Sequence, residues 1–237
     1  PLVDLMKKSR NTPGVKKVHI ASGLRMDLAR NETEYMDELV QHHVGGHLKV
    51  APEHTSDTVL NCMKKPAQHT FEEFAEKFDA ASKKAGKEQY LVPYFISSHP
   101  GSGVREMIDL AVNLKRNGYR PRQVQDFIPA PMDVATCMYY TGIDPYTMQE
   151  VPVARRLKAR LVQRALLQYW KAENWQTVRN ALMGEGREDL IGEGPDCLIP
   201  SLPPRIPKGE KQGHSAFSKS KGGYRHASRA GSRRRKE

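Results

Sequence analysis

The side chains best suited to chemistry in this sequence follow its short apolar stretches. They are Ser22 and Arg25 after residues 15–20, Lys49, Glu53 and His54 at the end of residues 47–50, Ser97 and His99 after residues 90–96, and Gln125 and Asp126 within residues 124–129. Hydroxyl, carboxylate and ammonium groups bind polar ligands, and histidine also transfers protons. In parallel α/β folds, such groups gather just beyond the carboxyl ends of the strands. If the stretches are parallel strands, the sequence predicts one polar site there.

The apolar stretches alternate with segments of helical spacing. Strands are predicted over residues 15–20, 47–50, 90–96 and 124–129, with helices between them. Asn31 is a possible N-cap with Glu34 three residues later, and Thr70 to Glu73 has the pattern of a capping box. Apolar residues recur on one helical face at Tyr35, Met36, Leu39 and Val40, and again at Phe71, Phe74, Ala75 and Phe78. This alternation predicts an α/β fold with a parallel sheet and right-handed crossovers.

The character of the chain changes after residue 150. Residues 153–170 have the pattern of a basic amphipathic helix, and residues 173–183 predict a second helix. The side chains expected to face inward from the first helix are Val153, Leu157, Leu161, Ala165 and Leu166, with Trp170 and Trp175 between the two helices. We therefore expect an α/β part over residues 1–150, a helical extension over 151–201 and a tail over 202–237.

Most of the positive charge lies in that tail. The formal net charge of the chain is +11, and eleven Lys and Arg against two acids give +9 from Ser201 onward, which leaves +2 for the rest. A segment with so few apolar residues cannot bury enough surface to offset its ordering entropy, so we expect it to be disordered. Any weak RNA binding predicted from charge therefore concerns the tail alone.

The sequence indicates neither a membrane-spanning segment nor a metal site. The apolar runs are shorter than the roughly 18 residues that span a bilayer, and no signal peptide follows Pro1, so a cytoplasmic protein without a membrane partner is expected. Cys62, Cys137 and Cys197 are too far apart for a CxxC or CxxxCxxC site and are expected to be buried thiols. The histidines at 42, 43 and 47 lack neighbouring cysteine or carboxylate ligands, so no metal site is predicted in this chain.

Several longer strings resemble one protein family. They are IASGLRMDLA, HLKVAPEH, PYFISSHPG, QDFIPAPM, MYYTGIDP and RALLQY followed by GREDLIG, and they fall in order between about Val15 and Pro200. They resemble the YgiQ family of radical S-adenosyl-L-methionine (SAM) proteins. The resemblance implies the C-terminal part of a partial (β/α) barrel, followed here by the small helical extension and the disordered basic tail.

The same resemblance implies a 4Fe–4S iron–sulfur cluster on a CxxxCxxC loop, SAM as its ligand and an electron donor that reduces the cluster. This sequence lacks that motif, so the cluster ligands are expected upstream of Pro1 and the chain alone is expected to be inactive. The resemblance leaves the substrate and the oligomeric state open.

Six residues are predicted to contact SAM or substrate if this resemblance holds. SAM carries a carboxylate and an ammonium, which Arg25 or Lys49 and Glu53 respectively could bind through charge-assisted hydrogen bonds. Ser22 and Ser97 could bind the ribose or amino groups. His99 is foremost a turn residue before Pro100, and secondarily an acid or base.

Two other functions remain open from the residues alone. One is a barrel lyase in which Lys49 forms a Schiff base, which requires a lysine desolvated enough to be neutral. The other is an RNA-binding protein that acts through the basic tail.

Overall fold

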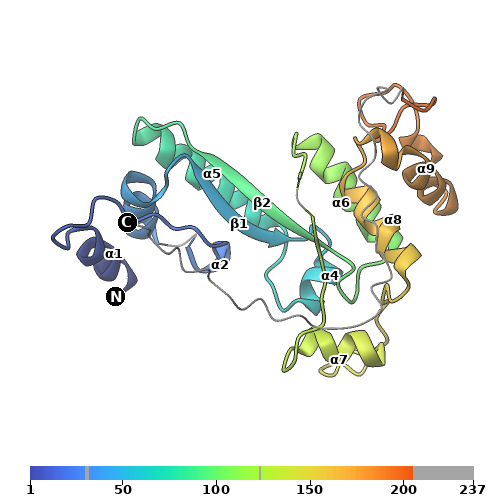
Figure 1. Ribbon diagram of the computed structural model, residues 1–237, viewed down its shortest axis with the longest axis horizontal. Coiled ribbons are helices and arrows are strands. Elements are labelled where there is room, and N and C mark those ends of the chain that lie inside the picture. The colour runs from blue at the N-terminus through green and yellow to red at the C-terminus, as the bar shows by residue number, and fades with distance from the viewer. Residues whose placement is uncertain (30–31, 123, 205–237) are drawn as a thin grey trace, which may run out of the picture. The chain divides into compact units, whose positions relative to one another are not determined.

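The structure, a computed structural model, describes residues 1–29, 32–122 and 124–204. Its sheet contains β1 (His47–Glu53), β2 (Tyr90–Ser97) and β3 (Gln125–Asp126), in the order β1-β2-β3 and all parallel (Figure 1). Helices α4 (Asp57–Cys62) and α5 (His69–Lys84) connect β1 to β2, and α6 (Val104–Arg116) connects β2 to β3. The predicted mixed α/β fold with parallel strands is confirmed as an open sheet, whereas the barrel remains a prediction.

The strand predicted over residues 15–20 is wrong. These residues form no ladder, and the chain joins β1 later, through a parallel bridge between Leu24 and Val50 in which Leu24 N donates to Lys49 O at 3.0 Å. Residues 15–17 are exposed and lack a neighbouring strand among the described residues, whereas Ile20 packs on the N-terminal core and its N donates to His43 O at 3.0 Å. β3 is also shorter than predicted and consists of Gln125 and Asp126, although Phe127 N still donates to Ser97 O at 2.8 Å.

One hydrophobic core lies between β1 and the helices of the N-terminal half. These are α1 (Leu2–Arg10), α2 (Met26–Ala29), α3 (Thr33–Glu38), the π-helix η1 (Leu39–His43) and α5. Leu48 and Val50 point from β1 toward Phe74 and Phe78, whose rings stack at 6.3 Å. Tyr35, Met36, Leu39 and Val40 are buried in this core, which confirms the predicted helical face.

Of the two predicted helix caps, one is wrong and the other lies outside the described residues. α5 begins at His69, so Thr70 lies inside the helix, where it is buried, and the capping box predicted there is wrong. Asn31 lies outside the described residues, and α3 has Glu32 at its N-cap without a side-chain capping bond.

A second core joins α6 to the helices of the C-terminal half. α8 (Leu157–Leu167) and α9 (Trp175–Gly184) pack there with the short 3-10 helices η2 (Ala172–Asn174) and η3 (Glu188–Leu190), while α7 (Val134–Thr141) precedes them in the chain. The core contains Leu110, Leu114, Leu166, Leu182 and Ile199 among its buried residues. The two predicted helices are thus present, and they share a core with α6. The boundaries predicted for the three parts of the chain stay predictions.

The predicted inward face of α8 is partly wrong. Leu157 and Leu161 are 73% and 53% exposed, whereas Ala165 and Leu166 are buried as expected. The buried residues of α8 are Gln163 and Ala165 to Leu167, and in its first turn Arg160 Nη2 donates to Phe127 O at 2.9 Å. Trp170 and Trp175 both pack on this core, and Trp175 Nε1 donates to Pro200 O at 2.9 Å.

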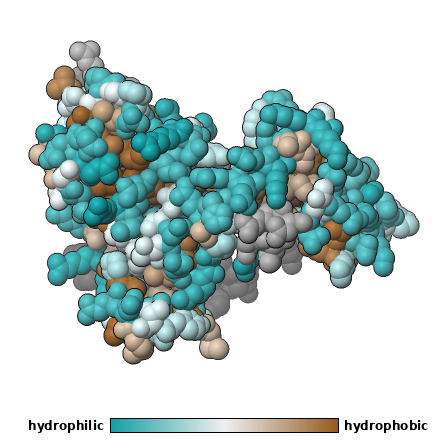
Figure 2. Space-filling model, turned by 180° about the vertical axis from the view of Figure 1, so that it is seen from behind, coloured by the Kyte–Doolittle hydropathy of each residue, from teal (hydrophilic) through white to brown (hydrophobic). Residues whose placement is uncertain are grey.

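Large apolar side chains also remain exposed around α7. Met132, Tyr140 and Met148 are 104%, 70% and 73% exposed. The face in Figure 2 is mostly hydrophilic with separate hydrophobic patches. No helix within the described residues is long and apolar enough to cross a membrane.

The cysteines are not the buried thiols that the sequence predicted. Cys62 and Cys197 are partly exposed, Cys137 is exposed, and all three are free. The described ranges contain no group of three His, Cys, Asp or Glu side chains that could hold a metal ion. His43 is buried and bonded to Val18 O at 2.7 Å and to Glu38 Oε1 at 3.2 Å, which gives it a structural role. The basic tail predicted to be disordered and to bind RNA lies outside the described residues beyond 204.

Candidate functional site

A cavity of about 310 Å³ lies at the carboxyl ends of the three strands. Glu53 from β1, Ile96 from β2 and Asp126 from β3 line it, and the connecting segments add Lys65, His99 and Asp133. Because the strands are parallel, their ends meet at this edge and carry side chains from distant parts of the sequence to one place. Four of the polar residues expected at the strand ends, Glu53, His99, Gln125 and Asp126, therefore line one cavity, and their role in binding stays a prediction.

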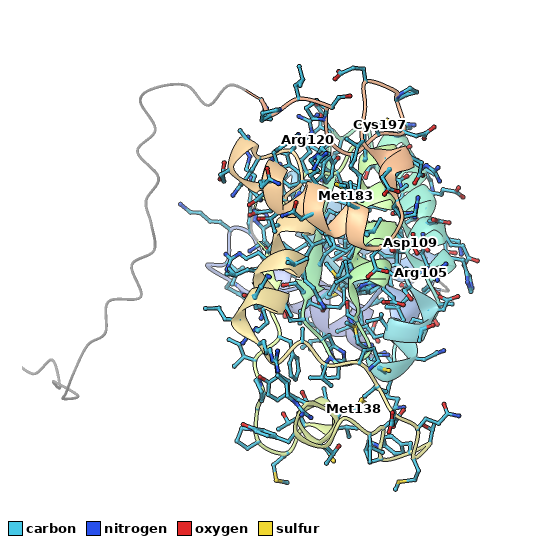
Figure 3. The ribbon with its side chains drawn as sticks, turned by 90° about the vertical axis from the view of Figure 1, so that its right-hand side faces the viewer. Arg105, Asp109, Arg120, Met138, Met183 and Cys197 are labelled. Carbon is cyan, nitrogen blue, oxygen red and sulfur yellow. The ribbon has the colours of Figure 1, made fainter. Side chains whose placement is uncertain are left out.

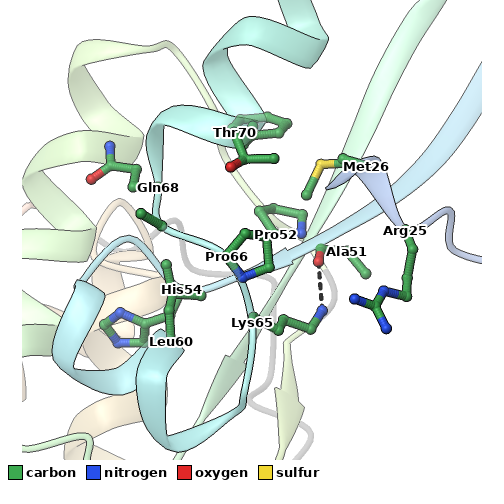
Figure 4. Close-up of a pocket in the computed structure, with 12 residues that line it drawn as sticks. Arg25, Met26, Ala51, Pro52, His54, Leu60, Lys65, Pro66, Gln68 and Thr70 are labelled. Carbon is green, nitrogen blue, oxygen red and sulfur yellow. Dashed lines mark hydrogen bonds between the residues drawn. The ribbon is translucent and has the colours of Figure 1, made fainter. Parts of the chain in front are cut away.

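An ion pair between Lys65 and Glu53 forms the charged part of the site. Lys65 Nζ lies 3.3 Å from Glu53 Oε1 and donates to Ala51 O at 2.8 Å (Figure 4). Both side chains are about one-quarter exposed, so a ligand can reach them. Lys65 also lines a smaller cavity of about 20 Å³ with Arg25, and in Figure 4 the ends of these two side chains point toward one another. Two cations and one carboxylate match the charges of a ligand that bears both a carboxylate and an ammonium.

Among the side chains that line the cavity, His99 is the one best suited to transfer a proton. It is 6% exposed, and its ring meets Phe127 edge-on at 5.1 Å. Its Nδ1 lies 2.7 Å from Pro100 O, so Nδ1 carries the proton and Nε2 is left as an acceptor. Burial lowers the pKa of His99, against the opposing effects of the Pro100 carbonyl and the charges of Asp133 and Glu53. The ring is therefore neutral near neutral pH and can accept a proton through Nε2.

The other polar groups at this edge are bound to the protein itself. Ser97 is fully buried and its hydroxyl donates to Asp126 Oδ1, while Asp126 Oδ2 lies 3.5 Å from Arg164 Nη1. Asp133 caps α7 by accepting from Ala135 N at 3.0 Å. These bonds hold β2, β3 and α7 together around the cavity. Ser97 and Asp133 therefore support its wall.

His54 and Ser102 come together without forming a nucleophile and base. His54 is 1% exposed, and its Nδ1 accepts hydrogen bonds from Thr55 N and Ser56 N, both at 3.0 Å. The proton must then reside on Nε2, which lies 3.5 Å from Ser102 Oγ. A histidine that activates a serine needs a free lone pair on the facing nitrogen, and here that nitrogen is a donor. The pair therefore stabilises the entry to α4.

Two residues at the strand ends adopt left-handed backbone conformations. Glu53 at the end of β1 has φ of 66°, and Ser98 directly after β2 has φ of 64°. Such conformations cost non-glycine residues on the order of 1 kcal/mol each and cluster at functional sites. Ser98 is 1% exposed, and its hydroxyl is the buried side-chain polar atom without a partner within the described residues. The strand ends therefore store strain next to the cavity.

We expect Ser98→Gly to raise the free energy of unfolding by about 1–2 kcal/mol, because glycine accepts this φ and removes the unpaired hydroxyl. Ser98→Ala is the matched variant, since it removes the hydroxyl and keeps the strain, and it should give about half of the gain. Urea unfolding followed by circular dichroism measures both. A loss of stability in Ser98→Ala would show that the hydroxyl is bound.

The structure brings three of the six predicted site residues to the two cavities. Arg25, Glu53 and His99 line them. Ser22 is exposed and lines neither. Lys49 is exposed, with its ammonium 5.9 Å from the centre of the Tyr94 ring. It lies four residues before Glu53, or about 13 Å along the strand.

Sequence reasoning missed Lys65 and Asp133 as members of the site. Lys65 follows α4, and basic residues are common at the C-terminal end of a helix, so its type alone did not indicate a site. Its ion pair with Glu53 depends on the turn over residues 63–68. Asp133 precedes α7, where it is a regular N-cap. Gln125 and Asp126 were recognised as a polar strand end, and both line the β3 side of the cavity.

Comparison with known proteins relates the chain to a set of bacterial and archaeal proteins. A family profile described as "Domain of unknown function (DUF3362)" matches residues 122–237. A UPF0313 protein of Chromobacterium violaceum is 49% identical over 208 residues, which cover 86% of this chain and 27% of that protein. UPF0313 proteins of Clostridium botulinum strain 657 and Methanosarcina acetivorans are 50% and 48% identical, each over 84% of this chain and over 31% and 27% of their own lengths.

These identities are spread over nearly the whole length of the chain, while the chain spans about one-third or less of the curated relatives it matches. Along most of its sequence, this chain is therefore a homologue of one part of the UPF0313 proteins.

Proposed function

We propose that this chain is a member of the YgiQ family and forms the C-terminal part of a radical SAM enzyme, whose substrate is open. The observation that carries the proposal is the group of Arg25, Glu53 and Lys65 at the carboxyl edge of a parallel sheet, beside a cavity of about 310 Å³. The similarity to UPF0313 proteins supports it, because that match covers 86% of this chain. Cytoplasmic location and an external electron donor belong to the same proposal.

The residues present fit the charged end of SAM. Lys65 and Arg25 would bind its carboxylate, and Glu53 would bind its ammonium. When bound, SAM supplies on reductive cleavage the oxidising group that removes a hydrogen atom from a substrate. In the chain itself, the neutral His99 would accept a proton at Nε2, and the buried Phe127 ring would form an apolar wall of the cavity.

The residues present do not fit a 4Fe–4S cluster. Its three thiolate ligands must lie together, and Cys62, Cys137 and Cys197 belong to separate elements, with no metal-binding group in the described ranges. Cluster ligands outside this chain remain part of the proposal, and no step of the reaction is derived through the cluster.

The Schiff-base alternative is not favoured. A lysine that attacks a carbonyl must be neutral, which requires a desolvated ammonium. Lys49 is exposed and its ammonium lies over the Tyr94 ring, which stabilises a cation. RNA binding through the tail stays a prediction.

In the longer Chromobacterium violaceum relative, we expect the substitution equivalent to Glu53→Gln to weaken SAM binding about tenfold, because the ammonium of SAM loses its charged partner. Isothermal titration with SAM measures the affinity. Lys49→Gln is the matched control: its position along β1 predicts unchanged affinity, whereas the prediction from sequence was a loss. Equal affinities in wild type and Glu53→Gln would remove the site assignment.

The reaction itself requires the longer proteins. The substitution equivalent to Glu53→Gln in the Chromobacterium violaceum relative, reconstituted anaerobically with iron and sulfide, should lower the yield of 5′-deoxyadenosine from SAM. If the wild-type relative forms no 5′-deoxyadenosine under reducing conditions, the proposed function fails, whatever the binding measurements give.

A further inference from the structure

A second large cavity lies near the amino ends of the strands. It has a volume of about 540 Å³ and is lined by the first half of β2, His47 at the start of β1, and residues 119–122 before β3. Its polar lining consists of His47, Tyr94, Tyr119, Arg120 and Arg122, and no acidic residue lines it within the described part of the chain. His47 lies six residues before Glu53, or about 20 Å along the strand, so this cavity is separate from the site at the carboxyl edge.

The short length of β3 creates this cavity. β2 pairs with β1 from Tyr90 to Phe95, but β3 pairs only with Ile96 and Ser97. Over residues 90–94, the other edge of β2 therefore lacks a strand neighbour among the described residues. Residues 119–122 run past this edge and leave the space open.

Buried contacts fix the segment that carries the two arginines. Gln168 is 6% exposed, and its Nε2 donates to Arg122 O at 2.8 Å and to Pro121 O at 3.4 Å. Lys171 Nζ donates to Gln168 Oε1 at 3.0 Å, and Tyr119 N donates to Leu114 O at 2.8 Å. The backbone of this segment is thus held by α6 and α8, while the guanidinium groups of Arg120 and Arg122 form no ion pair with another described residue.

Aromatic rings complete the lining. Tyr119 packs against Phe71 with 6.2 Å between ring centroids, and burial raises the pKa of its phenol, so it is neutral. Tyr94 is partly exposed on β2, and the Lys49 ammonium lies near its ring. Flat neutral rings next to arginines are the combination that binds a nucleobase by stacking and a phosphate by paired hydrogen bonds.

We propose that this cavity binds a nucleotide, with a phosphate held by Arg120 and Arg122 and the base stacked on Tyr94 or Tyr119. The volume falls in the range of small-ligand sites, about 300–1,000 Å³. The residues before Ser201 carry a net charge of only +2, so a cavity with two arginines and no acid is a local feature and does not follow from the overall composition. The nucleotide is either free or part of an RNA strand, since both present the same groups.

The test measures the affinity of the whole chain for AMP, for adenosine and for a ten-nucleotide RNA at fixed salt. Isothermal titration or fluorescence anisotropy gives these affinities. The variant is Arg120→Gln with Arg122→Gln. The control is Arg105→Gln with Lys8→Gln, which removes the same charge from exposed positions; Figure 3 shows Arg105 apart from Arg120. We expect the variant to lower the AMP affinity at least about tenfold and the control to leave it unchanged.

The three ligands separate the sources and the confounding effects. AMP that binds more tightly than the RNA, and that is lost in the variant, identifies a free nucleotide. RNA that binds more tightly than AMP, and is likewise weakened in the variant, identifies a nucleotide within a strand. RNA binding that the variant does not change comes from the basic tail, and together with the absence of saturable AMP binding it overturns the proposal. Equal affinities for AMP and adenosine, or AMP binding unchanged in the variant, overturn it as well.

Discussion

Replacing Gln163 with leucine is expected to lower the free energy of unfolding by about 3–4 kcal/mol. Gln163 is 2% exposed on α8, where its Oε1 accepts from Ser98 N at 2.7 Å and its Nε2 donates to Ser102 O at 2.6 Å. Ser98 and Ser102 are each 1% exposed, so the substitution leaves a buried N–H and a buried carbonyl without partners. Each such group costs about 1–3 kcal/mol, which exceeds the hydrophobic gain from leucine.

Urea unfolding at pH 7.5 measures this loss. Gln176→Leu provides a matched control, because Gln176 is exposed on α9 and bonds only to Asn180 among the described side chains. That variant should stay within about 0.5 kcal/mol of wild type. A loss below 1 kcal/mol in Gln163→Leu would mean that the turn over residues 98–102 relaxes to satisfy its own backbone.

The same substitution also bears on the candidate site. Residues 98–102 carry His99, and α8 reaches them through Gln163 alone among the side-chain bonds described for this turn. Loss of these bonds frees the His99 ring from its position against Phe127. Ligand binding at the carboxyl edge should therefore weaken together with stability, although Gln163 does not line the cavity.

The sequence predicted the features that depend on local periodicity. The buried faces at Leu39 and Val40 and at Phe74 and Phe78 follow from helical spacing, and the continuous apolar stretch 90–96 coincides with β2. Polar residues after parallel strands were predicted to meet at one edge of the sheet, and Glu53 and His99 line the same cavity there. These successes need only the direction of the strands and no knowledge of distant contacts.

The failures depend on contacts between distant segments. Residues 15–20 alternate like a strand, yet only a neighbouring strand could complete a ladder, and the described residues offer none there. Leu157 and Leu161 have the spacing of a buried face but lie on the part of α8 that α6 does not cover. Lys65 was overlooked because its partner Glu53 lies on the other side of α4. Gln163 and Ser98 are 65 residues apart, and no local pattern relates them.

The stability of the chain should fall as the pH drops from about 6.5, because His54 is buried in its neutral form. Burial, and then the nearby charge of His99, lowers the pKa of His54 from 6.5 to about 3. Between these values the unfolded chain binds a proton that the folded chain does not, so acid favours unfolding. The contribution of His54 is fully present above pH 6.5 and is lost as the pH falls toward 3. One pKa unit corresponds to about 1.4 kcal/mol, so we expect a loss of about 2 kcal/mol between pH 6.5 and 5.

The fold explains why His54 cannot simply take up the proton. Its Nδ1 accepts from Thr55 N and Ser56 N, and protonation would set a third donor against those two. The carboxylates with lowered pKa, Glu38, Asp144 and Asp189, titrate below the usual carboxyl range, so they do not contribute between pH 5 and 6.5. The lowered pKa values of His99 and His42 act in the same direction as His54, and a variant must therefore separate them.

His54→Gln supplies that separation. The variant loses stability at pH 7.5, since glutamine does not reproduce the ring acceptor, but the slope of its free energy of unfolding against pH between 5 and 6.5 should be smaller than in wild type. His69→Gln is the control, because His69 is exposed at the start of α5 and its removal should leave the slope unchanged. Urea unfolding at several pH values gives both slopes. Equal slopes for wild type and His54→Gln would assign the acid sensitivity to His99 or His42. Protonation of His54 would then not destabilise the hydrogen bonds that Thr55 N and Ser56 N donate to its Nδ1.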